Sequence, residues 1–244
     1  MSSETTEKPP TQAILDAPWI VLALIALLVA IHLALSVLGD QWLAWAIVSF
    51  AFVPTFVSGN EAPWIAGSQY WSFLTHAFLH SGFLHLAFNA LWLLIFGTVA
   101  ARRLGPLRFT LLFLLAVFGG ALATLALHWG EVMYLIGASG GVSGLLAAAI
   151  PVMYAGGQRH GFQEVVPGVR ALGFMELITH PPALKFMAIW LVLTIVSGST
   201  GLLVPGEPQN IAWEAHLGGF IGGLAAFYLL DRKFSAQPMQ SSSR

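Results

Sequence analysis

A serine near the middle of the chain is surrounded by glycines, in the run Gly137-Ala138-Ser139-Gly140-Gly141. The spacing of Gly137, Ser139 and Gly141 fits the G-x-S-x-G pattern that flanks the nucleophile of many serine hydrolases. In an apolar chain with 25 glycines, the same pattern more often marks a small-residue face on which two membrane helices pack. Ser139 is therefore a candidate nucleophile only if other segments bring a base and oxyanion donors to it.

Ionisable groups inside apolar segments are energetically costly, so their default interpretation is functional. Such groups occur in or beside three apolar segments: His32 in the first, His80, His85 and Asn89 at the second, and Glu214 and His216 in the last. His32 has no partner in the sequence pattern, so we interpret it as a packed or pore-facing histidine. His128 and His180 lie at the ends of apolar segments, and we expect them at the membrane interface.

The residue types predict acyl transfer. A serine hydroxyl attacks a carbonyl carbon only when a neighbouring base accepts its proton, and we expect His216 to be that base for Ser139. The developing oxyanion needs hydrogen-bond donors. We expect these from the side chains of Asn89 and His85, and from the backbone N–H of Ser139 at the start of a helix. Glu214 lies roughly 200° around a helix from His216, so it should point elsewhere, and a Ser–His dyad is predicted.

Six apolar runs can position these residues, because about 20 apolar residues cross a bilayer as a helix. They are 17–38, 84–101, 107–127, 140–155, 183–203 and 211–230, of which the fourth is short. The chain is 57% hydrophobic and only 9% charged, with a mean hydropathy of +0.78. These values exclude an ordinary soluble domain and predict an all-α polytopic membrane protein with a six-helix bundle.

The positive charges predict the orientation of these spans. None of the ten Lys and Arg residues lies in 39–83, 128–139 or 204–210, so the positive-inside rule places these three segments outside and both termini in the cytoplasm. A seventh span at 42–58 would place the cationic residues that follow it on the outer side and so break this bias. Pro54 also interrupts the apolar run at 42–58. We therefore expect residues 1–16 and 232–244 to be cytoplasmic tails around a 17–231 domain, with 39–83 as a long, membrane-associated outer loop.

The candidate residues are also predicted to lie at one depth. At about 1.5 Å per residue from the cytoplasmic ends, Ser139, His216, His85 and Asn89 are all about 20 to 25 Å up. His85 and Asn89 share a helix face at spacing i, i+4. The spacing of His216 with the supporting residues Gly219 and Gly223 also defines one face, and these glycines would admit the helix that bears Gly140, Gly141 and Gly144.

Composition excludes other functions. The net charge of −1 offers no basic surface for nucleic acid, and the absence of cysteine removes disulfides, thiolate metal sites and a cysteine nucleophile. No metal or cofactor is implied. The N-terminal residues lack the features of a signal or transit peptide, so we expect a bacterial inner membrane.

Five short motifs, in order, carry a family resemblance. They are Thr75-His76-Ala77-Phe78-Leu79-His80, His85-Leu86-Ala87-Phe88-Asn89, Phe96-Gly97, Gly137-Ala138-Ser139-Gly140 and Ala215-His216-Leu217-Gly218-Gly219-Phe220. Over about residues 17 to 231, the chain resembles the rhomboid intramembrane serine proteases. The resemblance implies a six-helix fold, Ser139 as nucleophile, His216 as general base, and Asn89 and His85 around the oxyanion hole, with His80 and Gly137 in support.

Such proteases cut transmembrane segments of other proteins near their outer ends, so the resemblance implies transmembrane substrates and the lipid bilayer as partners. It also implies that residues 198–210 form a cap over the site. Two positions depart from the family pattern. The chain has Trp71-Ser72 where Trp-Arg is usual, and Ala101 where many members carry Glu, which puts the anchoring of the first loop in doubt more than catalysis.

Several alternatives stay open at this stage. A non-catalytic member that binds or escorts membrane proteins would not need the Ser139 hydroxyl. A transporter would depend on His32, and a metalloenzyme would use His80, His85 and His216. Ser143, one turn beyond Ser139, becomes the candidate nucleophile if the fourth helix begins lower.

Overall fold

The computed structural model describes residues 17–157, 169–200 and 212–231. Within these ranges the chain is helical, and its β-structure consists of one isolated antiparallel bridge between Phe52 and Leu135. The predicted tails at 1–16 and 232–244, and most of the predicted cap at 198–210, lie outside the described residues.

Each of the six apolar runs corresponds to a helix or to a stack of helices. Their bounds are α1 Trp19–Leu38, α5 Phe83–Trp92 with η2 Leu93–Gly97 and α6 Thr98–Leu104, α7 Pro106–Leu127, α8 Ser139–Met153, α10 Pro181–Thr200 and α11 Trp213–Leu230. Trp19–Leu38, Phe83–Leu104 and Pro106–Leu127 are long and apolar enough to cross a membrane. The chain is therefore an integral membrane protein whose described part is all-helical.

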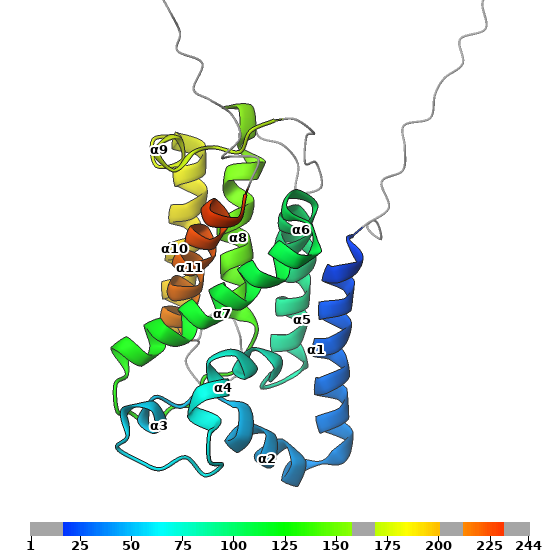
Figure 1. Ribbon diagram of the computed structural model, residues 1–244, viewed down its shortest axis with the longest axis vertical. Helices are drawn as coiled ribbons and strands as arrows, with labels where there is room; N and C mark the ends of the chain where they lie inside the picture. Colours follow the sequence, from blue (N-terminus) through cyan, green and yellow to red (C-terminus); the bar gives the residue numbers. More distant parts are fainter. Residues whose placement is uncertain (1–16, 158–168, 201–211, 232–244) are drawn as a thin grey trace, which may run out of the picture.

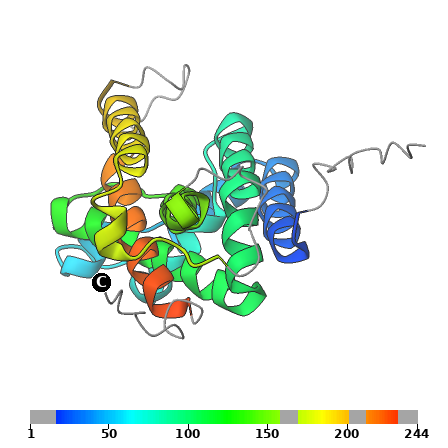
Figure 2. The ribbon, with the colours of Figure 1, turned by 90° about the horizontal axis from the view of Figure 1, so that it is seen from above.

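The helix α8 occupies the middle of the bundle, with the other long helices around it (Figure 2). Every residue from Gly140 to Met153 is buried. Its Gly- and Ala-rich sequence makes this possible, because small side chains let neighbouring backbones approach closely. A Cβ on Gly219 of α11 would lie 2.1 Å from the Gly140 carbonyl oxygen, and one on Gly223 would lie 2.2 Å from the Gly144 Cα.

Gly141 differs from this pattern. From the sequence, Gly141 was expected on the face toward α11 together with Gly140 and Gly144. In the structure, a Cβ on Gly141 would instead lie 2.4 Å from the Phe113 ring of α7. The 100° rotation per residue of a helix accounts for this difference, because the residue after Gly140 turns toward another neighbour. The glycines of α8 therefore admit two helices, α11 and α7.

The segment 39–82 lies at the end of the bundle where α8 begins (Figure 1). It contains α2 Asp40–Phe50, α3 Pro54–Ser58, α4 Ser68–Thr75 and η1 His76–Phe78. With 11 residues, α2 is too short to cross a bilayer. Pro54 is the first residue of α3, a position where the missing N–H of proline costs nothing.

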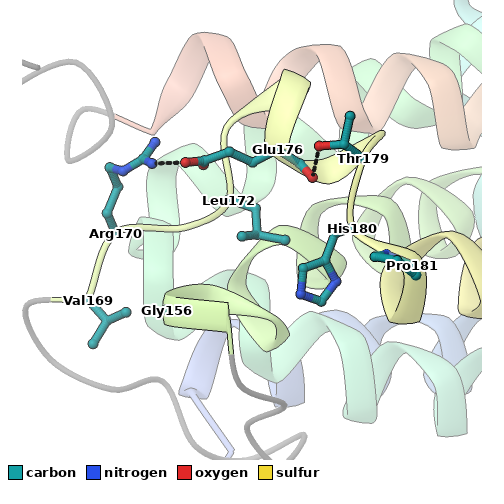
Figure 3. A pocket seen from close by; sticks show the side chains of 8 residues that line it. All are labelled: Gly156, Val169, Arg170, Leu172, Glu176, Thr179, His180 and Pro181. Carbon is teal, nitrogen blue, oxygen red and sulfur yellow. Dashed lines mark hydrogen bonds and ion pairs between the residues drawn. The ribbon is translucent and has the colours of Figure 1, made fainter.

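The opposite end of the bundle is held by a buried ion pair. Arg103 Nη2 lies 2.9 Å from Asp231 Oδ2, and Arg103 Nη1 donates to the Val169 carbonyl oxygen at 2.9 Å. A cavity of about 470 Å³ lies nearby, beside α9 Phe174–Leu177 and the start of α10. Figure 3 shows Arg170 and Glu176 paired on one side of it. None of the predicted site residues lines this cavity.

Candidate active site

Ser139 is the first residue of α8, so its backbone N–H has no partner from a preceding helical turn. The chain reaches this point through a sharp turn at Gly137, whose φ is 114°. Residues with a side chain rarely adopt a positive φ of this size, whereas glycine does so readily. The Gly137 N–H donates to the His76 carbonyl oxygen at 2.9 Å, which ties the turn to η1. Ser139 is half-buried, and α8 begins at the end of the bundle that carries α2 to α4 (Figure 1).

His216 lies in the first turn of α11 and is also half-buried. The starts of α8 and α11 are in contact, because a Cβ on Gly140 would lie 3.3 Å from the Ala215 carbonyl oxygen. Ser139 and His216 are the direct chain neighbours of these two residues. Among the described residues, no hydrogen bond joins the Ser139 hydroxyl to the His216 ring. Catalytic hydrogen bonds are often long before substrate binds.

The His85 ring lies directly over Gly137. Its Cε1 and Nε2 atoms are each 2.7 Å from the point that a Cβ on Gly137 would occupy, and the Ser139 Oγ is 3.8 Å from the same point. His85 is also within electrostatic range of the His216 ring. The structure thus brings together the predicted nucleophile, the predicted base and His85. A side chain at position 137 would displace His85, so Gly137 is required here by space as well as by φ.

Asn89 lies one turn beyond His85 and is buried. Its Nδ2 donates to the His85 carbonyl oxygen at 2.9 Å. An amide group carries two N–H donors, so this bond uses one of them inside α5. The Ser81 hydroxyl lies 3.0 Å from His85 Nδ1.

His80 is buried between two other histidines. Its ring centroid lies 5.1 Å from that of His85 and 6.5 Å from that of His32. Burial, with smaller contributions from His85 and His32, lowers the pKa of His80 to about 3, so it is neutral at physiological pH. His32 packs edge-on against Phe83 at 4.7 Å. Within the described ranges, no three His, Asp or Glu side chains converge as a metal site would require.

A polar network that was not predicted from the sequence joins the end of α7 to the start of α11. His128 Nε2 lies 3.1 Å from Glu214 Oε1, and His128 Nδ1 lies 2.8 Å from Glu131 Oε2. The sequence predicted His128 at the membrane interface and named no partner for it. A carboxylate buried beside the predicted base was the available signal, because such a group requires a cation or a strong donor.

Comparison with known proteins now identifies the family. The Rhomboid domain family model matches residues 67–233, which is more than half of the chain. The chain belongs to the rhomboid family. The matched range contains Ser139, His216, His85, Asn89 and His80, whereas α1 lies before it.

Curated rhomboid relatives match the chain at low identity. The rhomboid protease GlpG of Yersinia pseudotuberculosis serotype I (strain IP32953) is 28% identical over 228 residues, which is 90% of this chain and 65% of the relative. That of Yersinia pestis (strain Pestoides F) is 28% identical over 225 residues, with the same coverage. That of Serratia proteamaculans (strain 568) is 26% identical over 207 residues, which is 83% of this chain and 59% of the relative. The chain thus spans less than two thirds of these rhomboid relatives.

The two departures from the rhomboid pattern lie at buried positions, Ser72 and Ala101. The first loop is nevertheless anchored. The Ser72 carbonyl oxygen lies 2.8 Å from His76 Nδ1, and the Trp71 indole N–H donates to the Ser49 carbonyl oxygen at 2.7 Å. Thr75 Oγ1 donates to the Phe50 carbonyl oxygen at 3.0 Å. Backbone acceptors therefore hold α4 against α2 without an arginine at position 72.

Proposed function

We propose that the chain is an intramembrane serine endopeptidase that uses Ser139 and His216 as a dyad. One observation carries this proposal, namely the contact between the starts of α8 and α11 at Gly140 and Ala215. This contact lies next to Ser139 on α8 and next to His216 on α11, and the His85 ring lies over the adjacent turn at Gly137. The names of the GlpG relatives support the same reaction class.

In the first step, His216 accepts the Ser139 proton while Oγ attacks the carbonyl carbon of the scissile bond. His85 can stabilise the resulting oxyanion. When the Ser81 hydroxyl donates to His85 Nδ1, the ring proton resides on Nε2, which lies beside Gly137, and Nε2–H can donate. The second N–H of Asn89 and the backbone N–H of Ser139 are the other proposed donors.

The tetrahedral intermediate then collapses. The C–N bond breaks, His216 gives its proton to the leaving amine, and the acyl group remains on Ser139 Oγ. A water molecule, deprotonated by His216, attacks this ester. The bond between the acyl carbon and Ser139 Oγ then breaks, His216 returns the proton to Oγ, and the second product leaves as a carboxylic acid. Every proton in this cycle passes through His216, so no third residue is needed to complete it.

The proposal includes topology and substrate. We place six spans at α1, α5 with α6, α7, α8, α10 and α11, with both termini in the cytoplasm of a bacterial inner membrane. The 39–83 segment then lies at the outer face, as does the dyad. Substrates are transmembrane segments of other proteins, cut near their outer ends. We also propose that the protease domain extends from residue 17 to residue 231.

The test is cleavage of a model single-span substrate by the purified full chain in liposomes, with cut sites mapped by mass spectrometry. Ser139→Ala and His216→Ala should each abolish cleavage while unfolding at the wild-type temperature. Ser143→Ala, a buried serine one turn along α8, is the matched control and should retain activity. Cleavage that persists in Ser139→Ala would contradict the assignment of Ser139 and His216 as a catalytic dyad. A folded wild type that binds the substrate without cutting it would favour the non-catalytic, escorting role.

A further inference from the structure

The first turn of α11 contains a buried acid that the proposed chemistry does not use. Glu214 has a side chain only 5% exposed. Burying an ionised carboxylate is costly unless a charged or hydrogen-bonding partner accompanies it. The partner that the structure provides is His128, whose Nε2 lies 3.1 Å from Glu214 Oε1. The contact joins α11 to the residue that directly follows α7.

The surroundings of His128 favour its protonated, charged form. Its two ring nitrogens face two carboxylates, those of Glu131 and Glu214. A carboxylate only accepts hydrogen bonds, and a neutral imidazole has only one N–H, so both bonds form only with the imidazolium. Helix dipoles act in the same direction, because a cation at the end of α7 and an anion at the start of α11 are both favourable.

The charged groups around His128 all favour its proton. Hydrogen bonding to Glu131, with added contributions from the Glu214 and Glu131 charges, raises the pKa of His128 despite partial burial. Among the described residues, these two acids are the titratable groups that act on it. The interaction is therefore fully present below the ordinary histidine pKa of 6.5. It is lost as the pH rises through the elevated value.

The pair adjoins the proposed dyad through one peptide unit. Ala215 separates Glu214 from His216, and its carbonyl oxygen packs against two helices at once. It lies 3.3 Å from the point of a Cβ on Gly140 of α8, and 2.8 Å from that on Gly120 of α7. Anchoring Glu214 to the end of α7 therefore fixes the orientation of the same helical turn that presents His216 to Ser139.

We propose that His128 and Glu214 are positioning residues, in that their ion pair holds the first turn of α11 in register with α8 and makes turnover fall when His128 is deprotonated. This inference rests on the proposed protease function. It assigns the alkaline limb of the pH–rate profile to His128, which touches neither the substrate nor the reacting atoms.

The decisive variants change the charge and keep the shape. In Glu214→Gln the amide can still pair with His128 but carries no charge. We expect kcat to fall about 10- to 100-fold at neutral pH, because small misplacements of a catalytic group have effects of this order, with KM changed by less than about twofold. His128→Lys retains a cation over the whole range and should move the alkaline limb upward or remove it.

Glu131→Gln is the matched control. Its side chain is 61% exposed and contacts the same imidazole, so this variant should fold. It should keep the wild-type kcat near pH 6 and shift the alkaline limb to lower pH, because a carboxylate that stabilises the imidazolium is gone. An alkaline limb that stays in place in both Glu131→Gln and His128→Lys would overturn the inference.

Wild type and Ser139→Ala, assayed beside these variants, separate the two proposals. An inactive, folded wild type removes the protease function and the inference together. An active wild type with an inactive Ser139→Ala, combined with a fully active Glu214→Gln, removes the inference alone. Should Glu214→Gln fail to fold, the shifts of the alkaline limb in Glu131→Gln and His128→Lys test the inference in its place.

Discussion

The carbonyl oxygen of Ala215 lies 3.3 Å from the position of a Cβ on Gly140. This approach is possible because glycines recur along both helices, and it brings α8 and α11 together at the residues that flank Ser139 and His216. A side chain at Gly219 or Gly223 along this seam would clash with the backbone of α8 at 2.1 or 2.2 Å and push the two helices apart. The seam therefore offers the most direct mutational control of the candidate site.

Gly219→Ala should disrupt the seam, because its new methyl group would lie 2.1 Å from the Gly140 carbonyl oxygen. We expect a loss of about 1–3 kcal/mol in the free energy of unfolding and a loss of cleavage at temperatures where the variant is folded. Gly222→Ala is the control on the same helix. Its methyl group would lie 3.2 Å from the Leu115 carbonyl oxygen, so its effect should be smaller. Equal effects of the two variants on kcat and unfolding would contradict the argument.

Asn89→Ala should lower kcat by about 10²- to 10³-fold if the second N–H of this amide binds the oxyanion. Thr124→Ala is a suitable control. Thr124 is equally buried and bonds within its own helix, to the Gly120 carbonyl oxygen at 3.1 Å. Steady-state kinetics of both variants with the model substrate would decide. A loss of less than about tenfold in Asn89→Ala would limit this residue to packing α5.

Acid should destabilise the first loop. Burial lowers the pKa of His80 to about 3, and burial of His76 lowers its pKa to about 4, against 6.5 for an ordinary histidine. Both rings therefore contribute stability that is complete above about pH 6.5 and is lost as the pH falls below that value toward 3 to 4. Thermal unfolding of wild type should move to lower temperature over this range. A His80→Gln variant should show a shallower dependence, and an unchanged slope would exclude His80 as its source.

Asp231→Ala should destabilise the fold without altering the site. Removing one partner leaves Arg103 buried and uncompensated, which costs about 3–5 kcal/mol, whereas kcat well below the unfolding temperature should not change. The Arg170–Glu176 pair is the exposed counterpart, with side chains 37% and 48% exposed. Glu176→Gln should cost less than about 1 kcal/mol. Denaturant or thermal unfolding in detergent measures both, and similar losses would contradict this comparison.

The proposed topology can be tested with single cysteines, because the natural chain contains none. Glu61→Cys, in the loop before α4, should react with a membrane-impermeant maleimide in intact cells. Met175→Cys in α9, which is 70% exposed, should react only after the membrane is opened. Labelling of both positions from the same side would refute the proposed topology, which has an odd number of crossings between them, namely α5 with α6, α7 and α8.

Much of the fold follows from local sequence. The helices α1 and α7 fall on predicted runs because their apolar length is sufficient to cross a bilayer, and α8 falls on the predicted run that was already short. Ser139 opens its helix as expected, because the positive φ of Gly137 interrupts the chain just before it. The helical turns within 39–83 were not foreseen, because short helices there depend on packing against α1 and α7 more than on their own periodicity.

The candidate site was harder to predict where it depends on tertiary contacts. Counting residues placed His85 and His216 at a common depth, but depth says nothing about rotation around each helix. The link between His128 and Glu214 joins segments far apart in the sequence, so no spacing rule could reveal it. Helix rotation turns Gly141 away from the face of Gly140 and Gly144, but only the assembled bundle shows that α7 is the neighbour it meets.

The central helix α8 also determines how the surrounding lipid can act on the candidate site. Every residue from Gly140 to Met153 is buried, so acyl chains act on the helix of the proposed nucleophile mainly through its neighbours. A thinner or thicker bilayer should therefore tilt the peripheral helices α1 and α10 before it disturbs Ser139. Turnover in vesicles of graded acyl-chain length should accordingly vary in KM, through substrate entry, while kcat stays nearly constant.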